Sequence, residues 1–351
     1  MSSFTRAAAC IYRETADTVT IVFDQGSDSF SFKAGQFINL SLTINGEKVT
    51  RAYSLSSCPG DELPAITIKQ VDEGLMSTYI LNNAEEIKDW EVDGPHGFFH
   101  PTDATLNSKW VVLIGGGSGI TPLYSILKYL LRSTEINILL IDTNKREEDI
   151  IFGKALMHMQ QIFSDRLQTV QVFTKQLLAD TFVWKEAIEG RLTRIRLKKI
   201  IKQYTGEEYN NAHYFMCGPN GLLQLAEETL QSLEIPPAQI FNETFHSVEE
   251  ENTVELSNIV QEVLLHHYER SNLLEIAPGK TILEAALEDH VPVQYSCKNG
   301  TCGICIGKLT SGNVHMKKNY ALQQEQLEQG YVLLCQVHPL NNEVKIKVGE
   351  W

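Results

Sequence analysis

Four cysteines near the carboxyl end of the chain limit its possible folds more than any other feature. Cys297, Cys302 and Cys305 form the pattern Cys-x4-Cys-x2-Cys in one short loop, and Cys335 lies much further along the chain. The loop is rich in glycine, which allows the backbone to turn tightly and to point N–H groups at sulfur atoms. The end of the chain must therefore fold so that a predicted strand at Val332–Gln336 brings the fourth cysteine to this loop.

The spacing of these cysteines indicates an iron–sulfur cluster rather than a zinc site. Plant-type [2Fe–2S] clusters have the Cys-x4-Cys-x2-Cys spacing with a distant fourth ligand, whereas bacterial clusters have Cys-x2-Cys-x2-Cys. Structural zinc sites usually use two well-separated pairs of ligands, which this loop does not offer. The chain has seven cysteines, and an odd number with three scattered members argues against a disulfide framework. We therefore expect the four clustered cysteines to ligate a [2Fe–2S] cluster.

Residues 1–104 have the pattern of a small antiparallel β-barrel. Short runs rich in β-branched and aromatic residues alternate with Gly, Asp, Asn and Pro, which favour turns between strands. One helix is expected near residues 75–82. The expected strands are Thr18–Phe23, Gly35–Leu42, Lys48–Leu55 and Ala65–Val71.

Residues 105–246 have a different pattern, in which apolar strands alternate with helices. The first expected strands are Trp110–Ile114 and Ile136–Ile141, and the helices that follow them are Pro122–Leu131 and Glu148–Phe163. This alternation is typical of a doubly wound α/β domain with a parallel sheet.

The carboxyl-terminal part of the chain is expected to form a third domain. Residues 247–258 are polar and acidic, which is typical of a linker. Residues 259–351 contain short strands, one short helix, the cysteine loop and two terminal strands, so they predict a compact α+β domain. The sequence as a whole therefore predicts a multidomain protein.

The composition gives no reason to expect nucleic acid or a membrane as a partner. Apolar residues make up 43% and charged residues 21% of the 351 residues, which are ordinary values for a globular protein. The formal net charge of −14 opposes binding to a polyanion. No apolar run reaches the roughly 18 residues that span a bilayer, and the amino terminus lacks the apolar segment of a secretory signal. We expect a cytoplasmic protein, and the sequence does not indicate its oligomeric state.

A glycine-rich turn follows the first strand of the predicted α/β domain. It reads Gly-Gly-Gly-Ser-Gly-Ile-Thr-Pro over residues Gly115–Pro122. Glycines let a backbone approach a pyrophosphate, and the positive end of the following helix favours its charge. The string is neither Gly-x-Gly-x-x-Gly nor a P-loop, so the turn alone is also compatible with simple packing of a strand against a helix.

Two shorter motifs lie at the ends of predicted strands. Cys217–Pro219, which reads Cys-Gly-Pro, ends another strand of the α/β sheet, and open sheets place their ligands at such ends. Arg51–Ser54, which reads Arg-Ala-Tyr-Ser, ends a barrel strand. It offers a cation for a phosphate, an aromatic ring for stacking and a hydroxyl for a hydrogen bond. Each motif alone is also compatible with an ordinary buried cysteine or an ordinary barrel strand.

These four motifs, in this order along nearly the whole chain, resemble one family. The chain resembles the ferredoxin–NADP reductase superfamily in the arrangement that carries a C-terminal plant-type ferredoxin domain. Reductase subunits of phenylacetyl-CoA epoxidase systems and reductases of hybrid cluster proteins have this domain order. The resemblance implies a flavin-binding barrel, an NAD(P)H-binding α/β domain and a β-grasp ferredoxin domain. It implies FAD, NAD(P)H and a [2Fe–2S] cluster as cofactors.

The resemblance implies roles for individual residues of the barrel. Arg51 is expected to hold a flavin phosphate, Tyr53 to stack on the isoalloxazine ring and Ser54 to form a hydrogen bond near its N5 edge. A second phosphate contact, at a helix N-terminus, is expected from Gly74, Ser77 and Thr78.

The resemblance also implies a nicotinamide site in the α/β domain, beside the flavin. Cys217, Gly218 and Pro219 are expected to frame the nicotinamide, and Glu243 and Phe245 to lie next to the flavin. The turn residues expected to bind the nucleotide are Gly115, Gly116, Gly117, Ser118, Gly119, Thr121 and Pro122. The residues expected to take part in catalysis are Tyr53, Ser54, Cys217 and Glu243.

The resemblance leaves the choice between NADH and NADPH open. Where the family often has Tyr-Gly-Asn-Arg, this chain has Asp-Thr-Asn-Lys, from Asp142 to Lys145. An acidic residue at a strand end suits a ribose 2′-hydroxyl and hence NADH, whereas Lys145 and Arg146 suit a 2′-phosphate. Ser56 and Ser57 stand where an FMN-type reductase carries Cys and Asn, which favours FAD over FMN.

The predicted function is electron transfer from NAD(P)H to a protein acceptor. A flavin accepts a hydride and releases electrons singly, so it is expected between the nicotinamide and the cluster. The expected acceptor is an oxygenase or di-iron epoxidase component, and a hybrid cluster protein or a soluble ferredoxin would be served equally well. The sequence is also compatible with a flavin reductase whose cluster is peripheral and with a non-enzymatic redox sensor.

Overall fold

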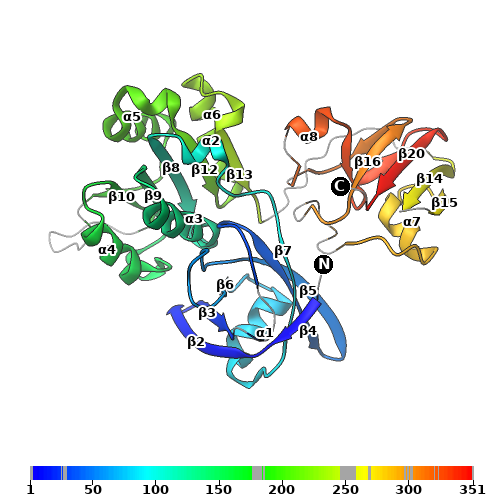
Figure 1. Ribbon diagram of the computed structural model, residues 1–351, viewed down its shortest axis with the longest axis horizontal. Coiled ribbons are helices and arrows are strands. Elements are labelled where there is room, and N and C mark those ends of the chain that lie inside the picture. Colours follow the sequence, from blue (N-terminus) through cyan, green and yellow to red (C-terminus); the bar gives the residue numbers. More distant parts are fainter. Residues whose placement is uncertain are drawn as a thin grey trace. The chain divides into compact units, whose positions relative to one another are not determined.

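The computed structural model divides the chain into two compact units, Met1–Phe245 and His246–Trp351 (Figure 1). It describes residues 3–24, 26, 30–175, 184, 186–245, 258–267, 270–295, 298, 300, 303–319, 321–322 and 324–349. The predicted linker, residues 247–258, lies outside the described residues except for its last position.

The first unit begins with an antiparallel barrel, as the sequence predicted. Its strands form a sheet in the order β1-β7-β4-β5 and a second sheet in the order β2-β3-β6. Ile21, Leu40 and Trp90 are completely buried between them. The strands are β1 (Ser3–Arg6), β2 (Ala8–Thr15), β3 (Thr18–Phe23), β4 (Phe37–Ile44), β5 (Glu47–Ser54), β6 (Ala65–Lys69) and β7 (Trp90–His96). The helices are α1 (Leu75–Asn83) and α2 (Asp103–Leu106).

The second half of this unit is the predicted α/β domain. All neighbouring strands of its sheet are parallel, and their order is β11-β10-β9-β8-β12-β13. Apolar side chains of the strands pack against α3 and α4 on one face and against α5 and α6 on the other. The strands are β8 (Trp110–Gly116), β9 (Asn137–Asn144), β10 (Leu167–Phe173), β11 (Ala187–Glu189), β12 (His213–Cys217) and β13 (Ile240–Glu243). The helices are α3 (Ile120–Ser133), α4 (Gly153–Ile162), α5 (Arg194–Thr205) and α6 (Asn220–Ser232).

The start of α4 corrects one prediction. The sequence pattern predicted a helix over Glu148–Phe163, but α4 begins at Gly153 after a 3₁₀ turn at Glu147–Asp149. Phe152 has a φ of 62°, in the left-handed region that a continuous helix cannot contain. The two segments are therefore separate elements. Other 3₁₀ turns lie at Ala84–Glu86, Gly117–Gly119, Gly206–Asn211 and Pro237–Gln239.

The second unit has the α+β architecture predicted for the ferredoxin domain. Its main sheet has the order β15-β14-β20-β16-β18, with β14 and β20 parallel, and β17 pairs with β19. Helix α7 packs on this sheet through Ile282 and Ala286. The strands are β14 (Gln261–His267), β15 (Arg270–Ile276), β16 (Ile306–Ser311), β17 (Val314–Met316), β18 (Tyr331–Leu333), β19 (Val337–Pro339) and β20 (Val344–Val348). The helices are α7 (Ile282–Glu288) and α8 (Gln324–Glu328).

The position of Cys335 corrects a second detail. A strand was expected over Val332–Gln336, but β18 ends at Leu333 and Cys335 lies in the turn before β19. The backbone N–H of Gln336 donates to the carbonyl oxygen of Leu333 at 2.8 Å. This turn hydrogen bond replaces sheet pairing at the cysteine.

Among the residues that the structure describes, none belongs to a helix long and apolar enough to cross a membrane.

Candidate functional site

The carboxyl ends of four neighbouring strands bring together residues that are distant in the sequence. Because the strands are parallel and in register, Gly115 of β8 pairs with Asp142 on one side and with Cys217 on the other, and Cys217 pairs with Glu243. These four residues therefore form one row at the edge of the sheet where α/β domains bind ligands. Figure 1 shows β8, β12 and β13 side by side.

A hydrogen bond joins this row to the barrel. The Ser54 hydroxyl, at the end of β5, donates to Glu243 Oε2 at 3.4 Å. Glu243 is half-buried, and burial raises the pKa of its carboxyl to about 8, although the hydrogen bond from Ser54 acts in the opposite direction. Near neutral pH the Glu243 carboxyl is therefore protonated, and it can release this proton where it meets Ser54.

Cys217 lies between Gly115 and Glu243 and is completely buried. Burial raises the pKa of its thiol well above the usual value, and Glu243 adds to this effect once it is ionised. The thiolate is the nucleophilic form of cysteine. Cys217 is therefore a neutral, compact wall of the site rather than a nucleophile.

The glycine turn packs so closely that part of it admits no side chain. A Cβ atom on Gly119 would lie 2.1 Å from the carbonyl oxygen of Cys217, and one on Gly116 would lie 3.0 Å from Leu222. Gly117 has a φ of 56°, which glycine adopts most readily. The turn thus delivers the start of α3 directly to the Cys217–Pro219 segment.

A side-chain hydrogen bond closes this turn at the start of α3. The Thr121 hydroxyl donates to the carbonyl oxygen of Ser118 at 2.8 Å. Pro122 follows within the first turn of the helix, where its missing N–H costs no hydrogen bond. The turn is therefore held in place by its own residues.

Helix α3 also fixes the barrel against the α/β domain. The Ser125 hydroxyl donates to the carbonyl oxygen of Ser57 at 2.5 Å, and the backbone N–H of Gly35 donates to the Ser125 hydroxyl at 3.3 Å. Lys128 and Arg132 both pair with Asp61. These contacts hold the barrel against the sheet, so that β5 and β13 lie close enough for Ser54 to reach Glu243.

The other predicted flavin residues lie on β5 and at the start of α1. Arg51 is exposed and Tyr53 is half-buried, and burial raises the pKa of the Tyr53 phenol, which therefore stays protonated. At α1, the Ser77 hydroxyl is buried, accepts from the backbone N–H of Val71 at 3.1 Å and turns back toward Gly74. An incoming phosphate would therefore meet the backbone of α1 more readily than the Ser77 side chain. The Thr78 hydroxyl accepts from Gln70 at 3.3 Å.

Near the end of β9, the acidic residue and the basic residues that bear on the choice between NADH and NADPH differ in exposure. Asp142 is 1% exposed and accepts a hydrogen bond from Asn144 at 2.7 Å. Burial raises the pKa of its carboxyl to about 6. Lys145 and Arg146 are exposed, and Arg146 pairs with Glu148 at 3.0 Å. The buried carboxyl of Asp142 is not presented to a ribose, whereas the exposed Lys145 ammonium can meet a ligand from solvent.

In the second unit, the described part of the cysteine loop suits a buried sulfur-ligated group. Cys305 is 3% and Cys335 5% exposed, and the backbone N–H of Leu334 donates to the carbonyl oxygen of Cys305 at 2.9 Å. Gly300 and Gly303 have φ values of 76° and 69°, which let this loop curve back on itself. The two thiols thus come from different segments to one apolar core, a setting that suits the soft ligands of iron. Cys297 and Cys302 lie outside the described residues.

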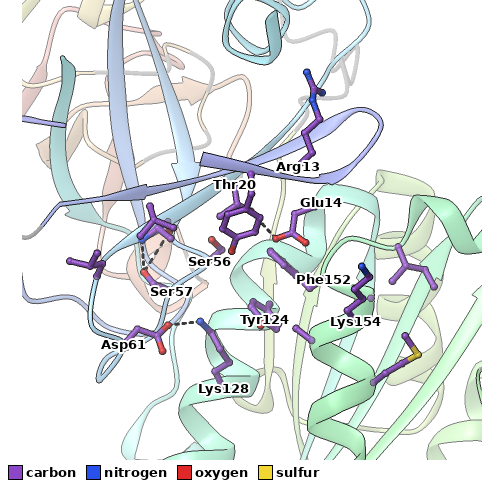
Figure 2. A pocket seen from close by; sticks show the side chains of 18 of the residues that line it. Arg13, Glu14, Thr20, Ser56, Ser57, Asp61, Tyr124, Lys128, Phe152 and Lys154 are labelled. Carbon is purple, nitrogen blue, oxygen red and sulfur yellow. Dashed lines mark hydrogen bonds and ion pairs between the residues drawn. The ribbon is translucent and has the colours of Figure 1, made fainter. Parts of the chain in front are cut away.

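A cavity of the first unit lies away from this row of strand ends. It has a volume of about 840 Å³ and is lined by β2, β3, the segment between β5 and β6, α3, and the start of α4 with the residues before it (Figure 2). Thr20 donates to Glu14 at 2.9 Å on its wall, and Tyr124 stacks on Phe152 with ring centres 4.1 Å apart. Its lining includes Ser56 and Ser57, which bear on the choice of flavin, but none of the residues predicted to bind the flavin or the nicotinamide. No sequence motif indicated this cavity, because its walls come from segments that share no pattern.

Comparison with known proteins matches all three parts of the chain. Residues 12–100 match the oxidoreductase FAD-binding domain, residues 113–228 the oxidoreductase NAD-binding domain and residues 267–340 the 2Fe-2S iron-sulfur cluster binding domain. The chain is 30% identical to the ferredoxin reductase component of 3-ketosteroid-9-alpha-monooxygenase from Rhodococcus rhodochrous, over 97% of this chain and 95% of that protein. It is 29% identical to a component of 1,2-phenylacetyl-CoA epoxidase from Escherichia coli strain K12, over 96% and 95% of the two chains.

The chain belongs to the ferredoxin–NADP reductase superfamily, in the branch with a C-terminal [2Fe–2S] domain. The reductase has the fold of phthalate dioxygenase reductase, with a TM-score of 0.59 and 20% identity over 99% of this chain and 98% of that chain. It also has the fold of part of an intact type IV self-sufficient cytochrome P450 monooxygenase, with a TM-score of 0.75 and 18% identity over 98% of this chain and 41% of that chain.

These findings confirm the predicted fold class and cofactors. The protein is an NAD(P)H-dependent oxidoreductase that uses FAD and a [2Fe–2S] cluster to pass electrons to a partner protein. The preference for FAD over FMN is confirmed by the match to the FAD-binding domain. The expectation of an enzyme, rather than of a redox sensor without catalysis, is confirmed as well.

Proposed function

We propose that the protein is the reductase component of an oxygenase system in the cytoplasm, and that its acceptor is an oxygenase or epoxidase protein. Relatives that match nearly the whole chain are components of a steroid monooxygenase, of an epoxidase and, at 26% identity in Pseudomonas aeruginosa strain UCBPP-PA14, of glycine betaine monooxygenase. The names of these three systems point to chemically different substrates. What the three reductase components share is delivery of electrons to an oxygenase. A hybrid cluster protein or a soluble ferredoxin is the second candidate acceptor.

The Ser54–Glu243 contact is the observation that carries the proposed mechanism. It joins β5 of the barrel to the strand-end row of the α/β domain, so that one polar point would face both the flavin and the nicotinamide sites assigned to these elements. A bound flavin accepts a hydride from the nicotinamide, and the cluster carries single electrons. Ser54 and Glu243 would hold a proton beside the bound rings, and the buried Cys217 would exclude water from them.

Binding of the two organic cofactors is assigned to the remaining predicted residues. Tyr53, half-buried, would stack on the flavin ring, and the exposed Arg51 would pair with its phosphates. The other flavin contacts assigned at the start of α1 are Gly74, Ser77 and Thr78, and Phe245 lies at the exposed end of the first unit. The nucleotide contacts assigned are Gly115, Gly116, Gly117, Ser118, Gly119, Thr121, Pro122, Lys145, Gly218 and Pro219.

The cluster ligands assigned are Cys297, Cys302, Cys305 and Cys335, in a ferredoxin domain of residues 259–351. The flavin domain is assigned to residues 1–104, the NAD(P)H domain to residues 105–246 and the linker to residues 247–258. In this order the [2Fe–2S] cluster, which carries single electrons, has a domain of its own. That domain can pass electrons to a protein acceptor.

Replacing a cluster ligand tests the proposed route. Cys335→Ser should remove the cluster signal and lower cytochrome c reduction by at least about a hundredfold, because single electrons would lose their exit. Ferricyanide reduction, which needs only the flavin, should change by less than about twofold. The exposed Cys10 provides a matched control, and Cys10→Ser should leave both activities intact. Undiminished cytochrome c reduction by Cys335→Ser would contradict the route through the cluster.

A further inference from the structure

The side chain that follows the fourth cysteine reaches back to that cysteine and to the opposite side of the loop. The Gln336 amide nitrogen lies 3.6 Å from Cys335 Sγ, 2.8 Å from the carbonyl oxygen of Cys335 and 3.1 Å from the carbonyl oxygen of Lys298. Gln336 is 7% exposed. A buried amide therefore joins the turn that carries Cys335 to the loop that carries the other cysteines.

The orientation of this amide is fixed by its neighbours. Two of its three close contacts are carbonyl oxygens, which can only accept hydrogen bonds. An amide oxygen in the same place would face these lone pairs, so the NH₂ group must point toward them. Its two hydrogens serve the two carbonyl oxygens, and the Cys335 sulfur, at 3.6 Å, shares one of them. The main chain of Gln336 is held as well, because its N–H donates to Leu333 and its carbonyl oxygen accepts from Lys317, both at 2.8 Å.

The aliphatic part of the side chain is also held in place. A Cβ atom on Gly300 would lie 3.0 Å from Cγ of Gln336 and 3.1 Å from the carbonyl oxygen of Lys318. Gly300 thus lets the cysteine loop approach the Gln336 side chain closely, and the donor cannot swing away from Cys335.

We propose that Gln336 is a positioning residue that raises the midpoint potential of the [2Fe–2S] cluster by donating a hydrogen bond to the Cys335 sulfur. This inference rests on the proposed assignment of Cys335 as a cluster ligand. One-electron reduction adds a negative charge that is shared by the cluster sulfurs. A donor beside a ligand sulfur stabilises that charge and so favours the reduced state, as hydrogen bonds to cluster sulfurs generally do.

Two substitutions separate this effect from simple packing. Gln336→Met keeps the unbranched shape that packs on Gly300 but removes the donor. Gln336→Glu keeps the length, removes the donor when ionised and adds a negative charge. The control is His338→Leu, since His338 is another buried polar residue of this unit, at 6% exposure. Its ring bonds to the carbonyl oxygen of Lys280 at 2.9 Å rather than to the cysteine.

The measurement is an anaerobic redox titration of the full-length holoenzyme, followed by the EPR signal of the reduced cluster. Gln336→Met should lower the equilibrium constant for cluster reduction about tenfold, which is roughly 59 mV for a one-electron couple. Gln336→Glu should lower it further, and His338→Leu should leave it unchanged.

A midpoint potential in Gln336→Met equal to that of the wild type and of His338→Leu would overturn the proposal. Failure of both Gln336 variants to hold a cluster would also overturn it, because Gln336 would then serve to close the loop rather than to set a potential. Absence of the cluster signal from the wild-type protein is a different result, which would contradict the assignment of the cysteines themselves.

Discussion

The flavin-side site and the cluster loop are built in opposite ways. At the flavin side, Ser54, Cys217 and Glu243 come from three elements that are far apart in the sequence, and strand register together with contacts between the barrel and the α/β domain brings them together. At the cluster, three of the four cysteines share one short loop, and the shape of the loop depends on local glycines such as Gly300. The first site therefore depends on the packing of two domains, whereas the second depends on local sequence.

The largest expected difference between the two sites comes from a substitution in the glycine turn. Gly119→Ala would place a methyl group 2.1 Å from the carbonyl oxygen of Cys217, and such overpacking costs about 1–3 kcal/mol. We expect the free energy of unfolding of the first unit to fall by that amount and NAD(P)H binding to weaken at least about tenfold. Denaturant titration and fluorescence titration with the nucleotide measure the two effects.

Gly221→Ala is the matched control for this prediction. Gly221 lies in α6, and a Cβ atom there would meet nothing within 4 Å, so the substitution should leave NAD(P)H binding unchanged. The cluster signal after reduction with dithionite should be the same in both variants. A weakened cluster signal in Gly119→Ala would show that the two sites are not built independently.

A separate effect, on the rate of flavin reduction alone, is expected from removing the proton at Glu243. Glu243→Gln keeps the hydrogen bond from Ser54 but cannot gain or lose a proton, and loss of a positioned acid or base commonly costs about a hundredfold in rate. Stopped-flow reduction of the flavin by NAD(P)H should slow by about tenfold to a hundredfold. The dependence of this rate on pH near the pKa of about 8 should disappear. A variant with the rate and the pH profile of the wild type would remove Glu243 from the mechanism.

The same carboxyl predicts a modest effect of pH on stability. The folded protein holds the Glu243 proton up to a pKa of about 8, compared with an ordinary value of 4.5. The contribution of this group to stability is therefore fully present below about pH 4.5 and is lost as the pH rises toward 8. The slope is at most about 1.4 kcal/mol per pH unit, and solvent reduces it because Glu243 is only half-buried. Denaturation of the cofactor-free protein at several pH values should show this slope in the wild type, and Glu243→Gln should lack it.

Local features were easier to predict from the sequence than contacts between distant segments. The cysteine spacing and the glycine turn are short motifs whose geometry follows from neighbouring residues. The Ser54–Glu243 contact crosses 189 positions and could be expected only from the resemblance to a family. Gln336 was not singled out, although it is adjacent to Cys335, because only the fold shows that its side chain turns toward the sulfur.

Several elements were missed or misplaced for physical reasons. Strand β2 carries Arg13 and Glu14, and β7 contains Gly94 and Pro95, so neither has the apolar alternation of a typical strand. The acidic residue at the end of β9 was considered for ribose binding, but Asp142 is buried against Asn144. A side chain at a strand end can point into the protein as well as toward a ligand, and the sequence does not distinguish these cases.

The most direct test of the account is an anaerobic titration of the purified wild-type protein with NADH and, separately, with NADPH. Visible absorption reports the flavin and EPR reports the cluster. The account predicts bleaching of the flavin followed by the signal of a reduced [2Fe–2S] cluster, and the exposed Lys145 beside the buried Asp142 favours tighter binding of NADPH. The contradicting result would be reduction of the flavin by either nucleotide while the cluster stays oxidised and no protein acceptor is reduced. The proposed electron path through the cluster would then be wrong.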